Sequence, residues 1–186
     1  MATPSGDLSF KGVRDGAIWE LTTDAVGTLT YGTGYAITMQ EFSMNPDINT
    51  AELPGNDVTL DIYAKAKGLT GTIKNAKVHS SFLATLLGAE VGTSANARVI
   101  KFDGDDLPAY FKIAVKIGYT GSDSTAVGVI TVYKCKLDSL EFSMNQDDYA
   151  TFSANFKAIP TTYVDANSKT LISLITIHSA DVSLLS

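Results

Sequence analysis

Hydrophobic and polar residues alternate with a period of two along four stretches of the chain, the pattern of strands that bury one face. In Val58–Lys67 the even positions are apolar while the odd positions are mostly polar. The same alternation runs through Ala109–Tyr119, Val127–Asn145 and Tyr149–Ile159. The polar residues Gln146–Asp148 separate the last two stretches, so we predict that these form an antiparallel hairpin.

Weaker strand patterns occupy much of the remaining chain. They lie at Ala17–Thr22, Thr28–Tyr31, Tyr35–Asn45, Leu69–Lys74, Arg98–Phe102 and Thr170–Ile177. The small residues of Gly92–Ala97 predict a loop, and Gly121–Thr125 predicts a turn between two long strands. The pattern therefore indicates a mainly β fold, a β-sandwich or barrel of two packed antiparallel sheets.

One segment has the pattern of a helix. In His79–Leu87, four apolar side chains recur at helical spacing, Ser80 can serve as the N-cap, and Gly88 suits the left-handed position that ends a helix. Because this helix is short and apolar on one side, we expect it to flank a sheet.

The sequence Glu-Phe-Ser-Met-Asn occurs twice, at residues 41–45 and 141–145. The apolar positions change from odd to even at the same place in both copies, between Met39 and Phe42 and between Leu137 and Leu140. A strand whose inward face changes parity needs a bulge or a bend between sheets. The second occurrence of this sequence therefore reflects either an internal repeat or convergent strand packing.

The connection Asn45–Asp57 is longer than a tight hairpin needs. Its middle has strand character and it ends in a Pro-Gly-Asn tip, so we predict a protruding β-hairpin arm. Such arms are either mobile excursions or interaction elements, and we favour interaction. The predicted contact residues are Asn49, Thr50, Ala51, Glu52, Leu53, Pro54, Gly55, Asn56 and Asp57.

Composition favours a protein that associates with copies of itself. The 186 residues carry a formal net charge of -6, which disfavours a protein that grips nucleic acid through its phosphates. Charged residues make up 18% and apolar residues 45%, so partners are expected to cover part of the surface. Met1–Gly6 shows no secretory signal, and no stretch approaches the length of a membrane span.

Candidate catalytic and metal-binding residues have simpler structural explanations. His79 and His178 lack a partner at metal-ligand spacing, and the single cysteine, Cys135, sits at an apolar strand position that predicts a buried thiol. Asp103, Asp105 and Asp106 resemble the start of a calcium loop, but Ala114 stands where the bidentate glutamate belongs. Gly68, Gly71 and Lys74 lack the phosphate-loop spacing, and Asp147 and Asp148 suit a turn. We therefore expect no enzymatic activity and no cofactor or metal.

Scattered short matches link the chain to one family. Gly12–Asp15, Thr30–Thr33, Asn49–Leu53 leading to Asn56 and Asp57, and Lys74–Val78 leading to Gly88 make it resemble the major tail protein of long, flexible-tailed bacteriophages. The likeness runs from about Gly12 to Ile159. It divides the single tail-tube domain, residues 1–186, into a core of about 12–160, an N-terminal arm at 1–11 and a C-terminal segment at 161–186.

This resemblance implies a structural virion protein. Such a subunit assembles into hexameric rings that stack into a tail tube, similar to the tubes of contractile phages and type VI secretion, and DNA passes through its lumen during ejection. The family's projecting hairpin corresponds to Asn45–Asp57 and contacts the next ring. Implied partners are other copies of the chain and the tail tip, tail terminator and tape measure proteins. The implied location is the phage tail, after synthesis in the host cytoplasm, without membrane contact or sequence-specific DNA binding.

Two further hypotheses follow from the sequence. An acidic lumen repels phosphates, so we nominate Asp103, Asp105 and Asp106, with the polar faces of the long strands, as lumen candidates. The alternative function is a non-catalytic β-sandwich module that binds carbohydrate. Its usual aromatic platform is missing, because Trp19 is the single tryptophan and tyrosines such as Tyr63, Tyr110 and Tyr149 suit protein contacts equally well.

Overall fold

A computed structural model covers residues 1–186 and describes residues 10–54, 59–75, 80–94, 97–119, 127–144, 151–165, 170–178 and 181–185. Along the chain the elements are β1 (Phe10–Ala25), β2 (Thr28–Ile37), β3 (Met39–Pro54), β4 (Thr59–Asn75), α1 (Ser80–Leu87), β5 (Glu90–Ser94), β6 (Ala97–Lys101), β7 (Phe111–Tyr119), β8 (Val127–Ser143), β9 (Thr151–Ala158) and β10 (Ser173–His178).

Ten strands form two antiparallel sheets, as the alternation predicted. The large sheet has eight strands in the order β2-β1-β7-β8-β9-β4-β3, with β10 paired to β8. The small sheet consists of β5 and β6. The predicted mainly β sandwich with one short helix and a protruding hairpin is confirmed.

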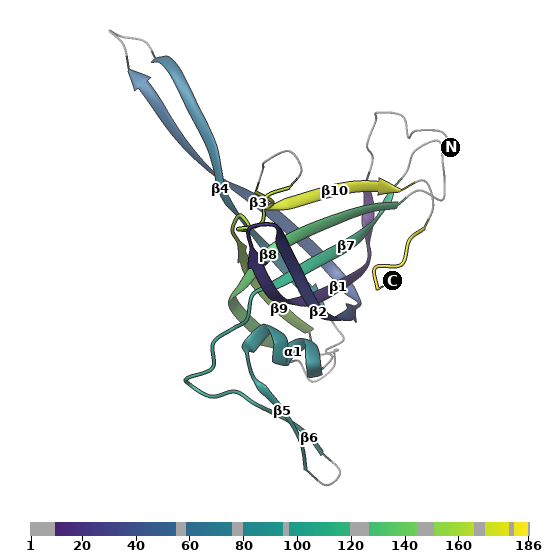
Figure 1. Ribbon diagram of the computed structural model, residues 1–186. Coiled ribbons are helices and arrows are strands. Elements are labelled where there is room, and N and C mark those ends of the chain that lie inside the picture. The colour runs from purple at the N-terminus through teal and green to yellow at the C-terminus, as the bar shows by residue number, and fades with distance from the viewer. Residues whose placement is uncertain are drawn as a thin grey trace.

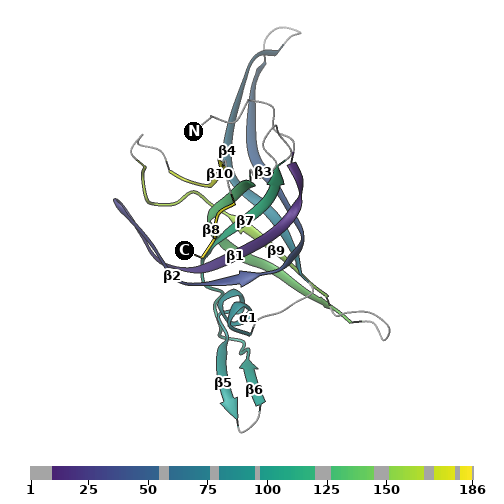
Figure 2. The same cartoon turned by 90° about the vertical axis from the view of Figure 1, so that its right-hand side faces the viewer.

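The large sheet curls back on itself. β2 and β3 lie at opposite ends of its strand order, yet only Thr38 separates them in the chain. The two ends must therefore meet, and a Cβ atom added at Gly16 of β1 would collide with the Met39 Cε atom on β3. Among the described residues no ladder joins β2 to β3, so the sheet folds over without closing as a barrel (Figure 2).

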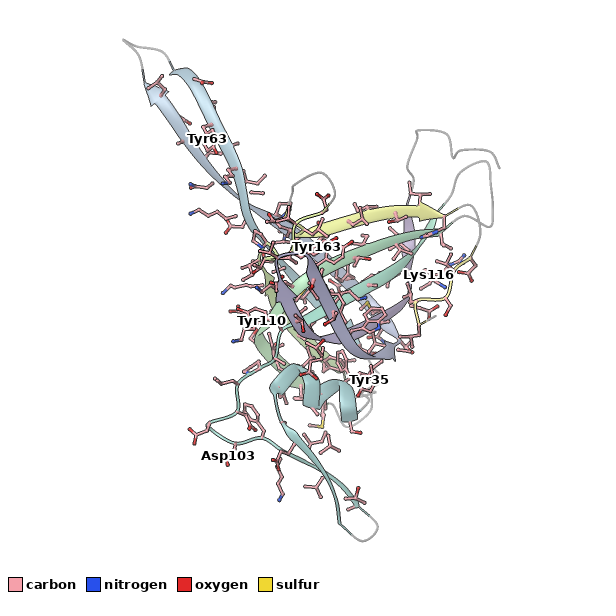
Figure 3. All side chains as sticks on the ribbon, viewed as in Figure 1. Tyr35, Tyr63, Asp103, Tyr110, Lys116 and Tyr163 are labelled. Atoms are coloured by element: carbon pink, nitrogen blue, oxygen red, sulfur yellow. The ribbon has the colours of Figure 1, made fainter. Side chains whose placement is uncertain are left out.

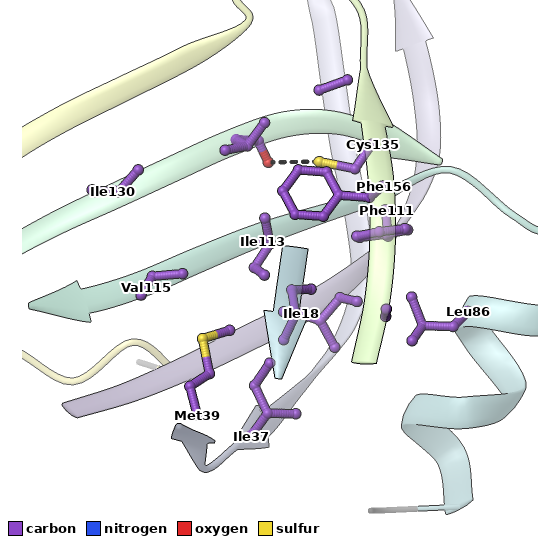
Figure 4. Packing of buried hydrophobic residues seen from close by; sticks show 14 of the residues in the cluster. Ile18, Ile37, Met39, Leu86, Phe111, Ile113, Val115, Ile130, Cys135 and Phe156 are labelled. Carbon is purple, nitrogen blue, oxygen red and sulfur yellow. Dashed lines mark hydrogen bonds between the residues drawn. The ribbon is translucent and has the colours of Figure 1, made fainter. Parts of the chain in front are cut away.

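The curled sheet encloses a single apolar core. The predicted inward positions of the long strands contribute most of it, and Figure 4 shows Leu86 of α1 directed toward the strands that carry Phe111 and Phe156. The alternation of β9 is fully borne out: Phe152, Ala154, Phe156 and Ala158 are each 1% exposed. Burial of these faces supplies the main driving force for the fold.

The helix lies across the end of the curled sheet opposite the arm (Figures 1 and 2). Phe82, Leu83 and Leu86 are buried, and the Phe82 ring packs 5.5 Å from that of Phe152. Gly88 has a φ of +70°, and the Ala89 N–H donates to the Ala84 carbonyl at 3.0 Å, which ends the helix as predicted. His79 lies outside the described residues.

The segment after Pro160 covers its own subunit. β10 adds to the edge of β8, from Ser173 opposite Val132 to His178 opposite Val127. Further on, the Asp181 carboxylate accepts a hydrogen bond from the Lys116 ammonium at 2.7 Å. Lys116 is a buried residue of β7. The C-terminal segment therefore covers this charged side chain on the outer face of the sheet.

Some strand bounds differ from the prediction. The predicted loop Gly92–Ala97 is wrong in part, because Gly92–Ser94 belongs to β5 and Ala97 begins β6. These residues are small and therefore favour a loop in the sequence. In the structure they are paired strand residues of a projecting hairpin. The predicted turns Gly121–Thr125 and Gln146–Asp148 lie outside the described residues.

Candidate functional site: an arm and two open sheet edges

The outer half of the β3–β4 hairpin stands away from the body. β9 pairs with β4 only as far as Leu69 opposite Ala158, whereas β3 and β4 stay paired out to Pro54 opposite Thr59. Beyond Ile48, which faces Ala66, the two strands have no other strand beside them in the described part of the chain. We call this two-stranded portion, residues 48–54 and 59–66, the arm (Figure 1).

Both faces of the arm are open to solvent. One face carries Ile48 and Ile62, which are 54% and 60% exposed. The other carries Leu53 and Tyr63, at 57% and 62%, and Figure 3 shows Tyr63 about midway along the arm. Large apolar side chains at such exposure on a long, flat pair of strands are typical of a surface that another protein covers.

The described part of the predicted arm, Asn49–Pro54, lies on this hairpin, which is larger than predicted, and the contact role of these residues stays a prediction. Asn49–Pro54 form its first strand, while Gly55, Asn56 and Asp57 lie outside the described residues. The second strand comes from the stretch predicted as a half-buried strand. That prediction is wrong for Asp61–Lys67, all of which are exposed, because nothing packs on either face.

The repeated sequence occupies equivalent places in two adjacent hairpins, β3–β4 and β8–β9. Four strands lie side by side in the order β8-β9-β4-β3, and we call them the four-strand block. Glu41 faces Lys74, Lys74 faces Ser153, and Ser153 faces Glu141, so the two glutamates stand at opposite ends of one row. The hairpins are thus related by an approximate two-fold axis normal to the sheet.

Both predicted changes of inward face are present as bulges. The register of β3 shifts between Met39 and Glu41, and that of β8 shifts between Leu137 and Ser139. After each bulge the phenylalanine of the repeat packs on β9, with ring centroids 6.2 Å apart for Phe42 and Phe156 and 6.4 Å for Phe142 and Phe152.

The two copies of the repeat also lie on the two open edges of the four-strand block. β3 ends the strand order and, in the part of the chain that the structure describes, pairs only with β4. β8 pairs with β7 no further than Cys135, so within the described residues its portion 137–143 pairs only with β9. Phe142 and Met144 are 49% and 76% exposed beside this second edge. Unpaired strand edges expose backbone donors and acceptors that another strand can use.

The predicted acidic lumen residues form a compact turn between β6 and β7. The Asp106 carboxylate accepts a hydrogen bond from the Asp103 N–H at 2.7 Å, and the Asp103 carboxylate accepts one from the Gly104 N–H at 2.7 Å. Asp105 is exposed. Figure 3 places Asp103 at the opposite end of the molecule from the arm. The lumen assignment stays a prediction.

The candidate chemical groups are engaged in structural contacts. Burial raises the pKa of the Cys135 thiol well above its ordinary value, and this group donates weakly to the Val132 carbonyl at 3.8 Å, so the predicted buried thiol is confirmed. The Lys112 ammonium lies 3.8 Å from the Trp19 ring and 4.4 Å from the Tyr31 ring. One face of the single tryptophan is therefore occupied.

His178 is half-buried at the end of β10. Asp147, Asp148 and Tyr149 lie outside the described residues. Among the residues with described positions, no group of three or more His, Cys, Asp or Glu side chains is placed to hold a metal ion. No helix in the same part of the chain is both long and apolar enough to cross a bilayer.

No protein-family profile matches the chain, and no curated protein sequence matches it. Two solved structures are similar over most of their length. One is a "Cryo-EM structure of the anti-feeding prophage (AFP) baseplate, 6-fold symmetrised", 7% identical, with a TM-score of 0.46 over 95% of this chain and 97% of that chain. The other is a "Structure of a type six secretion system protein", 15% identical, with a TM-score of 0.39 over 87% and 91%. At these values the similarities carry no argument about what this chain does.

Proposed function

We propose that this chain is a structural subunit that assembles with copies of itself into the tail tube of a long-tailed phage. Copies join side by side through the open edges of β3 and β8 and close into hexameric rings. The rings stack through the arm, and the resulting tube conducts DNA. The resemblance of the sequence to tail-tube subunits supports the virion assignment, and tail tip, terminator and tape measure proteins are its proposed further partners.

The observation that carries this proposal is the direction of the two open edges. Along the four-strand block each strand is antiparallel to the next, so β3 and β8 run in opposite directions. When two copies stand side by side in the same orientation, β3 of one therefore meets β8 of the next as an antiparallel neighbour. The joint uses a different surface on each copy, and such a heterologous joint makes a closed ring when its rotation closes.

The arm supports stacking between rings. It projects from one end of the body, while α1, the β5–β6 hairpin and the Asp103 turn lie at the other end (Figures 1 and 3). An arm that extends along the stacking direction reaches the neighbouring ring, where its exposed apolar side chains can be buried.

Cross-linking between edges tests the lateral joint. We expect a Glu41→Cys, Glu141→Cys double variant, treated with a flexible bismaleimide at assembling concentrations, to give a ladder of covalent oligomers on denaturing gels. Because Cys135 is buried, its thiol does not compete. The two single variants are the controls, since one cysteine per chain cannot extend a chain of heterologous joints beyond a dimer.

Electron microscopy of the concentrated protein decides the class of assembly. We expect rings or hollow rods, with the cross-linked ladder ending at closed rings. A ladder absent from the double variant while tubes are visible would show that the subunits join through other edges. Protein that remains monomeric at every concentration, and in the presence of tail-tip initiators, would overturn the tube assignment itself.

A further inference from the structure

The four-strand block has an outer face, opposite the core, that is composed entirely of polar side chains. Along each strand, every second residue belongs to this face. The apolar residues that alternate with them, such as Ile73 and Phe156, point into the core. Its outward positions are Glu41, Ser43, Asn45, Asp47, Thr70, Thr72, Lys74, Thr151, Ser153, Asn155, Lys157, Lys136, Asp138, Ser139, Glu141 and Ser143.

The uncharged centre of this face is joined across three strands. The Thr72 hydroxyl on β4 donates to the Asn155 side-chain oxygen on β9 at 2.7 Å, and the Asn155 side-chain nitrogen donates to the Ser139 hydroxyl on β8 at 2.8 Å. These short side chains hold one another in place. The centre therefore offers neither a free cation nor an aromatic ring on which a base could stack.

Each lysine of the face already has a partner within the same subunit. The Lys74 ammonium lies 2.8 Å from the Glu41 carboxylate, and the Lys157 ammonium lies 2.6 Å from the Asp138 carboxylate. Lys136 directs its ammonium toward the Tyr110 ring, 5.2 Å from the centroid. With Asp47 and Glu141 included, four carboxylates face three lysines, so the face carries no excess of positive charge and its cations are masked.

In the proposed ring this face is the one that lines the lumen. Joining copies through the β3 and β8 edges makes one continuous sheet from the four-strand blocks. The parts of each subunit that enclose the core with this sheet, β1, β2, β7 and α1, lie on its core side. This bulk fits on the outer, wider side of a closed ring, which leaves the polar face directed inward.

We infer that the outer face of the four-strand block is a contact surface for double-stranded DNA on which paired carboxylates keep the lysines from holding the phosphates. The inference rests on the proposed function for its partner. Duplex DNA that touches this face meets hydroxyl and amide groups. To contact Lys74 or Lys157 it would have to separate an existing ion pair, and to contact Lys136 it would have to draw the ammonium away from the Tyr110 ring. Free lysines hold DNA because they release counterions from its phosphates, and lysines that stay paired do not cause this release.

Freeing the lysines tests this role in the full-length protein. In Glu41→Gln, Asp138→Asn, both carboxylates become neutral groups of the same shape, while Lys74 and Lys157 remain. We expect wild-type protein to show no measurable affinity for a short DNA duplex at about 50 mM salt. We expect the double variant to bind, with an affinity that falls about tenfold between 50 and 200 mM salt, as about two phosphate contacts require.

A charge-matched control separates this face from net charge. Glu52→Gln, Asp61→Asn makes the same change on the arm, where neither carboxylate takes part in an ion pair among the described residues. It should not bind the duplex. Adding Lys74→Gln and Lys157→Gln to the first variant should abolish the gained affinity.

Equal binding by the face variant and the arm variant, or duplex binding by wild-type protein, would overturn the inference. So would a face variant that remains unable to bind although its circular dichroism spectrum matches the wild type. Binding is measured on the subunit and tube formation by microscopy. Failure of tubes to form would therefore count against the proposed function, whereas failure of the variant to bind would count against the masked face.

Discussion

At the scale of single residues, Asp24 makes the densest set of polar contacts in the described chain. Its carboxylate accepts a hydrogen bond from the Lys134 ammonium at 2.6 Å, from the Thr162 N–H at 2.8 Å and from the Tyr163 N–H at 3.0 Å. The side chains of Asp24 and Lys134 are only 7% and 15% exposed. One carboxylate thus ties the β1–β2 hairpin to β8 and to the segment after β9.

We expect Asp24→Asn to lower the free energy of unfolding by about 2 kcal/mol, because it leaves the enclosed Lys134 charge without its counter-charge. Urea unfolding followed by circular dichroism measures the loss. Glu41→Gln is the matched control, since the Glu41–Lys74 pair is half exposed and its removal should change stability by no more than about 0.5 kcal/mol. Equal losses in the two variants would show that Asp24 is no special anchor.

The same carboxylate gives the stability a defined pH dependence. Burial of the Asp24 side chain would raise its pKa, but the hydrogen bonds from Lys134, Thr162 and Tyr163 outweigh burial and lower the pKa from 3.8 to about 2. A depressed folded-state pKa stabilises the fold above the unfolded-state value and loses that contribution as the pH falls through the folded-state value. The stability gap between wild type and Asp24→Asn, measured by urea unfolding, should therefore be constant above about pH 5 and close toward pH 2. A gap that stays unchanged down to pH 2 would contradict this assignment.

At the scale of elements, periodicity and the repeat predicted the most. The change from odd to even inward positions at Met39 and Phe42, and again at Leu137 and Leu140, predicted a bulge in each strand, and both bulges are present. Parity is read directly from sequence because one inserted residue reverses every later side chain. Gly88 likewise predicted the end of the helix, since few other residues adopt its backbone conformation.

The sequence did not predict those features that are set by the elements packing against a strand. Alternation in Val58–Lys67 shows that the two faces of the strand differ, but not that either face is covered, and in the arm neither is. The sequence predicted a strand at Arg98–Phe102, close to β6, but it missed β5, and with it the hairpin, for the converse reason. Its residues, including Gly92 and Thr93, have little apolar periodicity because the hairpin contributes almost nothing to the core.

Truncation of the arm tests its role as an element. The register pairs Ile48 with Ala66, so residues 49–65 can be replaced by Asn-Gly to give a two-residue hairpin turn without disturbing the strands below. Because the described side chains removed are exposed, we expect a melting temperature within a few degrees of wild type. We also expect rings that no longer lengthen into tubes in electron micrographs. Long tubes from the truncated protein would contradict a stacking role for the arm.

At the scale of the whole molecule, the fold is asymmetric along two directions, because its two ends differ and its two sides differ. Two hairpins project from opposite ends, the arm at one and β5–β6 at the other (Figures 1 and 2). Across this axis, the four-strand block presents β3 at one side and the far part of β8 at the other. When unlike surfaces of such subunits join, side to side and end to end, every copy keeps the same orientation, as a tube of stacked rings requires.

This asymmetry makes a mixing experiment decisive. Met44→Lys and Met144→Lys each place a charge at the same position of the repeat, on opposite edges of the four-strand block, where charge opposes strand pairing. Because Met44 is half-buried against the core, a wild-type circular dichroism spectrum is required of its variant before the mixing experiment. In each variant, one of the two edges that form a joint can no longer pair. Each variant alone should therefore remain monomeric in sedimentation velocity. Mixed together, the intact β8 edge of Met44→Lys meets the intact β3 edge of Met144→Lys, which permits one joint per pair and no further growth. The mixture should therefore contain heterodimers and no rings. Rings from either variant alone, or a mixture that stays monomeric while wild type assembles, would show that copies do not join through these two edges.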